Sequence, residues 1–201
     1  MKVCLIGNNL TSLIFGYILS KKKIYSEIYS IKNSKSIFKT RTIGIANYNL
    51  NYLSNYFKNI YKKTNPINEI QVLIQDGKIK EEISFNKNSE ILFNMIKYDK
   101  LISYIKSNVI ANKYISLKFF KKNTDLILLT NKKKFDLIIN CEGSNILTKK
   151  YLKNGIYKNY FNKAFTTIIK HEKIKNSKAK NFFIGLNYNS IKVHKLLLVT
   201  K

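Results

Sequence analysis

The first thirty residues of this chain constrain its fold more than any other segment. Residues 3–6 (VCLI) form a short uninterrupted apolar run, which is typical of a strand buried in a parallel sheet. The run ends at Gly7, and from residue 10 apolar side chains recur at helical spacing until lysines occupy residues 21–23. Residues 24–29 return to a strand pattern. A strand, a turn, a helix and a second strand in this order predict an α/β fold with a parallel sheet.

The turn between the first strand and the helix is a candidate nucleotide-binding site. Dinucleotide-binding folds carry G-x-G-x-x-G at this turn, where the backbone approaches a pyrophosphate and the helix N-terminus supplies N–H donors. The matching window, residues 7–12 (GNNLTS), keeps only the first glycine. An ordinary α/β protein that binds no dinucleotide therefore stays open as the alternative. The residues expected to contact a cofactor here are Gly7, Asn8, Asn9, Leu10 and Ser12.

Three side chains near this turn differ from the usual pattern. Asn9 replaces the second glycine, which adds bulk near the phosphate, although asparagine tolerates left-handed backbone well. Ser12 replaces the third glycine, a smaller change to the packing of helix against strand. At the end of the second strand, alternation places Ser30 rather than Glu27 where an acidic residue normally holds the ribose. We expect Ser30 to bind a ribose, less strongly than a carboxylate would.

The charge of the chain is strongly positive, since 37 basic residues against 11 acidic ones give a formal net charge of +26. Such a charge first suggests a nucleic-acid partner. However, the lysines are spread along the chain and accompany much Asn, Ile and Tyr, so a compositional bias explains them better than a binding surface does. We expect no specific nucleic-acid partner. Arg41, the single arginine, suits phosphate through its planar, bidentate fork.

The residues that commonly carry metal or nucleophilic chemistry are scarce. Cys4 and Cys141 lie in apolar strand-like runs without metal-ligand or redox spacing, so we expect both to be small core residues. His171 and His194 are isolated. We therefore name no catalytic residue and no metal ligand. Polar residues interrupt the N-terminal apolar stretch and no cleavage site follows it, which argues against a signal peptide and favours a cytoplasmic protein.

The rest of the chain alternates between helical and strand patterns. Helical spacing covers residues 48–61 and 98–109, and residues 70–74 and 79–85 read as a hairpin. Residues 114–120 and 126–130 look like antiparallel strands, followed by a buried strand at 135–140 and a strand-like run at 161–169. From residue 174 onward no clear pattern is visible.

The order of these segments resembles the FAD-dependent aromatic-ring hydroxylases, and most closely those of ubiquinone biosynthesis. Besides the N-terminal turn, three windows carry the resemblance: residues 41–46 (RTIGIA), 95–105 (MIKYDKLISYI) and 137–145 (LIINCEGSN). The last window is similar to the family's Gly-Ala-Asp-Gly turn and the Ser-x-x-Arg after it. Glu142 stands for the Asp, Ile146 for the Ser and Lys149 for the Arg. In the second window the family usually has an Arg where Asp99 stands.

This resemblance implies a Rossmann-like FAD-binding three-layer fold with a β-meander, incomplete, and with part of a substrate-domain sheet inserted. It covers residues 1–175 and leaves residues 176–201 as a tail of uncertain structure. It implies that FAD contacts the Gly7 turn, Arg41, Glu142 and Gly143. The reductant would be NAD(P)H or another electron donor, and the substrate a small aromatic or polyprenylated phenol. It also implies association with a biosynthetic complex or the inner membrane surface.

Two departures from the family limit what the chain is expected to do. The family's second flavin signature, a Gly-Asp turn, does not occur here, and residues 180–201 do not resemble what should follow. A shortened or frameshifted reading frame would explain both. The resemblance therefore implies a monooxygenase as a truncated chain. The alternatives are a nucleotide-binding α/β remnant without catalysis and a basic nucleic-acid-binding module.

Overall fold

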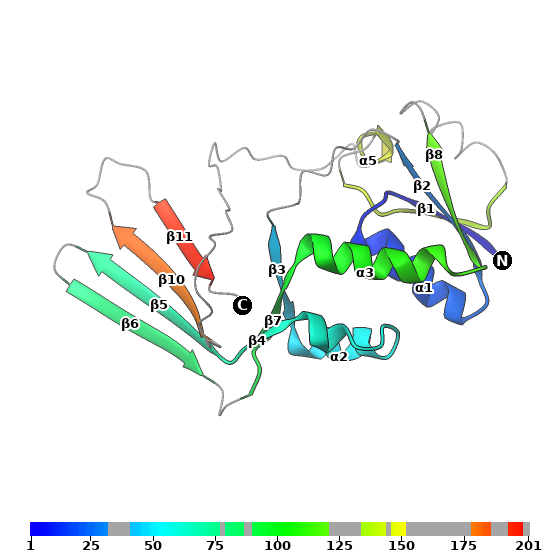
Figure 1. Ribbon diagram of the computed structural model, residues 1–201. Coiled ribbons are helices and arrows are strands. Elements are labelled where there is room, and N and C mark those ends of the chain that lie inside the picture. Colours follow the sequence, from blue (N-terminus) through cyan, green and yellow to red (C-terminus); the bar gives the residue numbers. More distant parts are fainter. Residues whose placement is uncertain are drawn as a thin grey trace. The chain divides into compact units, whose positions relative to one another are not determined.

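The computed structural model describes residues 1–31, 41–76, 79–86, 90–120, 134–143, 146–151, 178–185 and 193–198 (Figure 1). The chain divides into two compact units. The first contains Met1–Thr40 and Asp99–Thr166, and the second contains Arg41–Tyr98 and Thr167–Lys201. The domain boundary expected near residue 175 lies outside the described residues. No helix within these ranges has the length and apolar character needed to cross a bilayer.

A four-stranded parallel sheet forms the centre of the first unit. Its strands are β1 (Lys2–Ile6), β2 (Tyr25–Ile31), β8 (Ile115–Phe120) and β9 (Leu137–Asn140), in the order β8-β2-β1-β9. Numbered along the chain within this sheet, that order is third, second, first, fourth, which matches the first four strands of the classic dinucleotide-binding order 3-2-1-4-5-6. The predicted α/β fold with a parallel sheet is confirmed.

The helix α1 (Leu10–Lys21) connects β1 to β2 and packs closely on one face of the sheet. Gly16 allows this approach, because a Cβ atom there would lie 3.1 Å from Ile28 Cδ1 and 3.3 Å from Leu5 Cδ1. Leu13 on the same helix is fully buried. The strand, turn, helix and strand predicted from the first thirty residues are therefore all present.

The other face of the sheet carries an apolar cluster around Tyr29. The Tyr29 ring stacks on Phe120 with centroids 4.8 Å apart and meets Phe135 edge-on at 6.1 Å. Cys4, Ile6 and Leu147 complete the buried part of this cluster, the last from the short helix α5 (Ile146–Tyr151). Cys4 thus lies in the core, as predicted.

A buried carboxylate lies at the margin of this cluster. Glu27 is 4% exposed and pairs in register with Cys4 in the middle of the sheet. Its oxygens lie 2.7 Å from Lys2 Nζ and 3.8 Å from Lys134 Nζ, and one accepts a hydrogen bond from the Tyr29 hydroxyl. Two lysines therefore balance the charge of the carboxylate, and one hydroxyl donates a hydrogen bond to it.

The helix α3 (Tyr98–Ile110) confirms the predicted helical spacing, since Leu101, Ile105 and Val109 are buried. After it, Asn112 joins two elements of the first unit. Its Nδ2 donates to Ser20 Oγ at the end of α1 (2.8 Å), and its Oδ1 accepts from Tyr114 N just before β8 (3.0 Å).

The first sheet of the second unit is antiparallel and has the order β3-β7-β4. Its strands are β3 (Thr42–Ala46), β7 (Phe93–Lys97) and β4 (Asn65–Ile67). The single helix predicted over residues 48–61 is instead α2 (Asn47–Ser54) followed by the 3₁₀ helix η1 (Ile60–Lys63). Asn59, immediately before η1, has a left-handed backbone with φ +62°, which a continuous α-helix does not allow.

The second sheet of this unit has the order β11-β10-β5-β6. The predicted hairpin is confirmed as β5 (Glu69–Asp76) against β6 (Ile79–Asn86). The strands β10 (Lys178–Gly185) and β11 (Val193–Leu198) occupy the segment where the sequence showed no pattern. β10 pairs in parallel with β5, and β11 pairs antiparallel to β10.

Two predictions about the strands after residue 113 need comment. β8 pairs in parallel with β2, while its expected antiparallel partner at residues 126–130 lies outside the described residues, as does the run at 161–169. β9 was predicted to be buried. Instead, β9 forms one edge of the described sheet, because it pairs only with β1 there, and Leu137 is 47% exposed.

Candidate functional site

The carboxyl ends of β1 and β9 form the candidate site. In an open α/β sheet the strand order reverses between these two strands, and ligands bind in the crevice at such a point. A pocket of about 690 Å³ lies here, within the range of about 300–1,000 Å³ common for ligand sites. Its lining comes from Ile6 of β1, Thr11 of α1, Ile138 and Asn140 of β9, residues 141–143 after β9, and Leu147, Thr148 and Tyr151 of α5. All of these residues belong to the first unit.

Gly7 begins the turn that leads from β1 into α1. Its φ of +115° is a conformation that side chains other than glycine rarely adopt. A Cβ atom there would lie 3.2 Å from Asn9 Nδ2 and 3.3 Å from Glu142 Cβ. The Gly7 N–H donates to Tyr29 O at 2.8 Å, which fixes the turn to the end of β2. The backbone conformation thus requires glycine at this position, and the space for a Cβ atom is tight.

The N-terminus of α1 is capped in a way that leaves two donors available. Ser12 N donates to Asn9 Oδ1 (3.1 Å), and Asn9 N donates to Ser12 Oγ (3.2 Å). The N–H groups of Leu10 and Thr11 have no acceptor among the described residues. No acidic residue lies in the first turn of the helix. Unpaired N–H groups at the positive end of a helix dipole favour an anion such as phosphate.

The side chain of Asn9 occupies the place of the second glycine. Its backbone is extended (φ −119°, ψ 176°), so the residue needs no tolerance for left-handed backbone. Its Nδ2 donates to Cys141 O at 2.7 Å. The bulk that the sequence suggested would lie near the phosphate is thus held by the backbone after β9.

The turn after β9 contains Glu142 and Gly143, which both line the pocket. Glu142 N donates to Asn140 Oδ1 (3.2 Å), and Glu142 O accepts from Thr148 Oγ1 (2.9 Å). Asn140 Nδ2 also donates to Thr148 Oγ1 (2.8 Å), which ties the turn to α5. The structure therefore brings the Gly7 turn and the Glu142-Gly143 turn together, as their shared assignment to one site requires.

The other predicted contacts in the first unit are less exposed. Ser30 lies one residue beyond Tyr29, the last β2 partner of β1, and is 8% exposed. Asn8 Oδ1 is buried without a hydrogen-bond partner among the described residues. An unpaired buried acceptor costs about 1–3 kcal/mol, so this atom can gain a donor from a ligand hydroxyl if the turn adjusts. The roles of Ser30 and Asn8 toward a ribose or cofactor stay predictions.

Arg41 begins the second unit. Its carbonyl oxygen accepts from Tyr98 N at 2.8 Å, and its guanidinium carbon lies 5.9 Å from the centroid of the Tyr98 ring. This places Arg41 beside the junction of β7 and α3. Its contact with a phosphate stays a prediction.

The sequence did not indicate Thr11, Thr148 and Tyr151 as pocket residues. Thr11 lies inside the 7–12 window but at a variable position of the glycine pattern. Thr148 and Tyr151 belong to α5, and only the tertiary fold brings that helix to the pocket. A hydroxyl two residues after an N-cap was the one signal in the sequence that could have indicated Thr11.

The cysteines are unsuited to nucleophilic chemistry. Burial, with a smaller contribution from the Glu27 charge, raises the pKa of the Cys4 thiol to about 12. Burial also raises the pKa of Cys141. Both thiols are therefore protonated at neutral pH. Within the described ranges, no three His, Cys, Asp or Glu side chains gather as a metal-ligand set.

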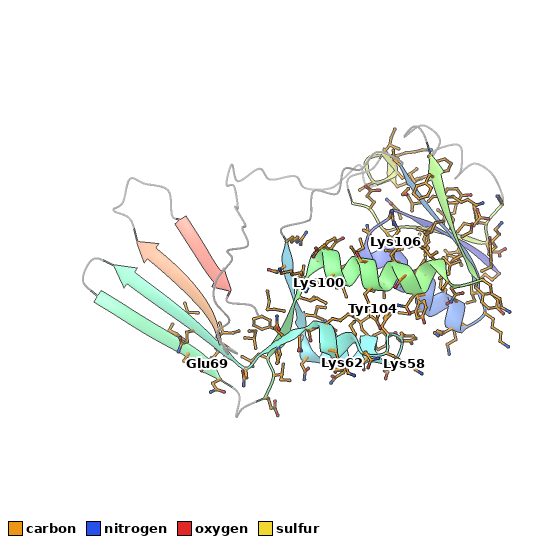
Figure 2. All side chains as sticks on the ribbon, in the orientation of Figure 1. Lys58, Lys62, Glu69, Lys100, Tyr104 and Lys106 are labelled. Carbon is orange, nitrogen blue, oxygen red and sulfur yellow. The ribbon has the colours of Figure 1, made fainter. Side chains whose placement is uncertain are left out.

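Basic side chains occur on elements of both units. Figure 2 labels Lys100 and Lys106 on α3, and Lys58 and Lys62 on the segment that follows α2. Lys58, Lys62 and Lys100 are exposed. The lysines of the described residues are thus spread over several elements, as along the sequence.

Comparison with known proteins gives similarity to solved structures alone, since no family model and no curated protein matches the chain. PqsL, a probable FAD-dependent monooxygenase from Pseudomonas aeruginosa, is 12% identical with a TM-score of 0.49 over 59% of this chain. The p-nitrophenol 4-monooxygenase PnpA from Pseudomonas putida DLL-E4 is 10% identical with a TM-score of 0.47 over 58%. CtdE in complex with FAD is 13% identical with a TM-score of 0.43 over 59%. The matched parts cover 32%, 31% and 30% of those chains, so this chain spans about a third of their length.

Proposed function

We propose that this chain binds the diphosphate of FAD at the carboxyl ends of β1 and β9 and that it is part of an FAD-dependent monooxygenase. One observation carries the proposal: the sheet order β8-β2-β1-β9 places a glycine turn and a helix N-terminus at the strand reversal, with two N–H groups available. In α/β folds this combination serves the binding of nucleotide phosphates.

The residues present fit a diphosphate in three respects. The N–H groups of Leu10 and Thr11 have no acceptor in the part of the chain that the structure describes, and Thr11 lines the pocket. Gly7 lets the backbone turn sharply just before these N–H groups in the chain. The side chain of Asn9 is turned to Cys141 O rather than left free in the turn. These residues would hold the phosphates. Glu142 also lines the pocket, and its carboxylate would suit hydroxyl groups of a ribose or ribityl chain.

The finer part of the proposal concerns the reaction. The order of motifs that resembles the ubiquinone-biosynthesis hydroxylases supports an aromatic or polyprenylated phenol as substrate and hydroxylation of its ring as the reaction. FAD, reduced by NAD(P)H or another donor, would supply the chemistry with oxygen. The chain's own contribution is to bind and orient the cofactor and to exclude water from it.

The test is whether the protein takes up FAD. We expect the purified chain, incubated with FAD and desalted, to retain flavin absorbance in the visible range. Titration with ADP should displace part of the flavin, because the proposed contacts are with the diphosphate. Failure to retain FAD or to bind ADP would refute the cofactor proposal. Retention of ADP without FAD would instead favour a nucleotide-binding protein without flavin catalysis. Oxidation of NAD(P)H stimulated by a phenol would support the monooxygenase part.

A further inference from the structure

The side chain amide of Asn9 is bonded at both ends. Oδ1 accepts from Ser12 N within the same helix, and Nδ2 donates to Cys141 O, a residue 132 positions away. The first bond caps the helix, and the second joins the turn after β1 to the turn after β9. Because both ends of the amide are hydrogen-bonded, the side chain is held in one orientation.

The bond to Cys141 continues the pairing of β1 with β9 beyond the ends of the strands. Cys141 N donates to Ile6 O at 2.8 Å as the next step after the last paired residues, Ile6 and Asn140. Cys141 O then accepts from Asn9 Nδ2 at 2.7 Å. Both backbone polar groups of Cys141 are therefore bound to the segment formed by β1 and its turn. This happens at the point of strand reversal, where the two strand ends would otherwise separate.

We propose that Asn9 is a positioning residue for nucleotide binding: its amide clamps the turn at residues 141–143 to the phosphate-binding turn. This inference rests on the proposed function. The close packing around Gly7 supports it, because the place of a Gly7 Cβ lies within 3.3 Å of both Asn9 Nδ2 and Glu142 Cβ. A small shift of either segment would change the distance between the free N–H groups of Leu10 and Thr11 and the Glu142-Gly143 turn. The clamp fixes that distance before the nucleotide arrives, which lowers the cost of binding.

Asn9→Ser separates the two bonds of the amide. Serine is a good N-cap residue, so the bond from Ser12 N is kept, while its shorter side chain cannot reach Cys141 O. Asn112→Ser is the matched control. Both ends of the Asn112 amide are also hydrogen-bonded, since Nδ2 donates to Ser20 Oγ and Oδ1 accepts from Tyr114 N. These bonds lie beside the opposite end of α1. Both variants lose comparable hydrogen bonds, and only the first alters the nucleotide site.

The experiment measures the affinities of ADP and FAD for the full chain by calorimetry, with Tm recorded for each variant. We expect Asn9→Ser to weaken both ligands about tenfold and Asn112→Ser to change them less than about twofold, at similar losses of Tm. Equal or tighter binding by Asn9→Ser would overturn the clamp, and tighter binding would mean that Asn9 obstructs the crevice. Equal weakening by Asn112→Ser would also overturn it, since the effect would then follow stability. If the wild-type chain binds neither ligand, the proposed function fails, and the clamp's role in binding fails with it.

Discussion

At the scale of single residues, the first unit requires particular residue types at the beginning and at the end of β1. At the beginning of β1, the partly exposed Lys2 pairs with the buried carboxylate of Glu27. At its end, the backbone conformation of Gly7 is the constraint. The two sites differ in origin. The ion pair is an electrostatic constraint, because the Glu27 carboxylate has little contact with water. The constraint at Gly7 is steric.

Gly7→Ala should destabilise the protein by about 1–3 kcal/mol, because alanine must adopt a strained backbone and its Cβ would lie tightly against Asn9 and Glu142. Urea denaturation measures this change. Gly143→Ala is the control, since no described residue other than its chain neighbours comes within 4 Å of the Cβ that it would add. Equal stabilities of the two variants would contradict the requirement for glycine at residue 7.

Glu27→Gln should destabilise the protein at pH 7 and have a smaller effect in acid. Burial by itself raises the pKa of Glu27, but hydrogen bonds from Lys2 and Tyr29 and the Lys134 charge outweigh it and hold that pKa below its usual value. A lowered pKa in the folded state adds stability above the unfolded pKa of about 4.3, which is lost as pH falls through the folded value. We expect a loss of about 1–3 kcal/mol at pH 7. Urea denaturation at pH 7 and at acidic pH should show the two proteins converging, and a constant difference would contradict an ionised Glu27.

At the scale of elements, the contact of α1 with the sheet depends on one small residue. Gly16 lies where the helix approaches β1 and β2, and no larger side chain fits without movement of Leu5 or Ile28. This close approach also sets where the N-terminus of α1 lies relative to the end of β1. The position of the Gly7 turn therefore depends on packing in the middle of the helix, about two turns away.

Gly16→Leu should destabilise the protein by about 1–3 kcal/mol or more through overpacking, although leucine is the better helix former. Thermal unfolding followed by circular dichroism measures the effect. Phe15→Leu is a neighbouring control, because Phe15 is 37% exposed and its replacement disturbs little packing. A stabilised Gly16→Leu variant would show that the helix and sheet are less closely packed than described.

The elements also show what the sequence could predict. The strand, helix and strand of residues 2–31 carry local signals, namely an apolar run, a glycine and helical spacing, so they were identified correctly. β10 was not, because it is specified by pairing with β5 more than 100 residues earlier. The 48–61 helix was predicted as continuous because its apolar spacing continues through the left-handed Asn59. Within the site, Gly7 was visible in the sequence, but the bond from Asn9 to Cys141 joins distant segments and was not.

At the scale of the whole molecule, the proposed site belongs entirely to one of the two units. The pocket, the Gly7 turn and the turn after β9 all lie in the first unit, while Arg41 begins the second. A ligand that binds the folded state and not the unfolded state must then stabilise the first unit directly. Its effect on the second unit depends on how strongly the two units are coupled.

Saturating FAD should raise the stability of the chain by about 2.7 kcal/mol at a free concentration about 100 times Kd. Hydrogen–deuterium exchange should localise the effect: the N–H groups of Leu10 and Thr11 should become protected, as should residues 141–143. Protection restricted to the second unit would contradict the placement of the site. Adenosine, which lacks phosphate, should give little protection at the same concentration.

The order β8-β2-β1-β9 has a consequence for the chain while it is being synthesised. β1 is central in the described sheet, yet it leaves the ribosome before the other three strands, and its neighbour β9 follows more than 100 residues after β2. At ordinary rates of elongation, β1 waits roughly ten seconds with one side unpaired. An unpaired apolar strand is a site for wrong pairing. The nascent chain should therefore bind chaperones most strongly before residue 140 emerges and release them once β9 is in place.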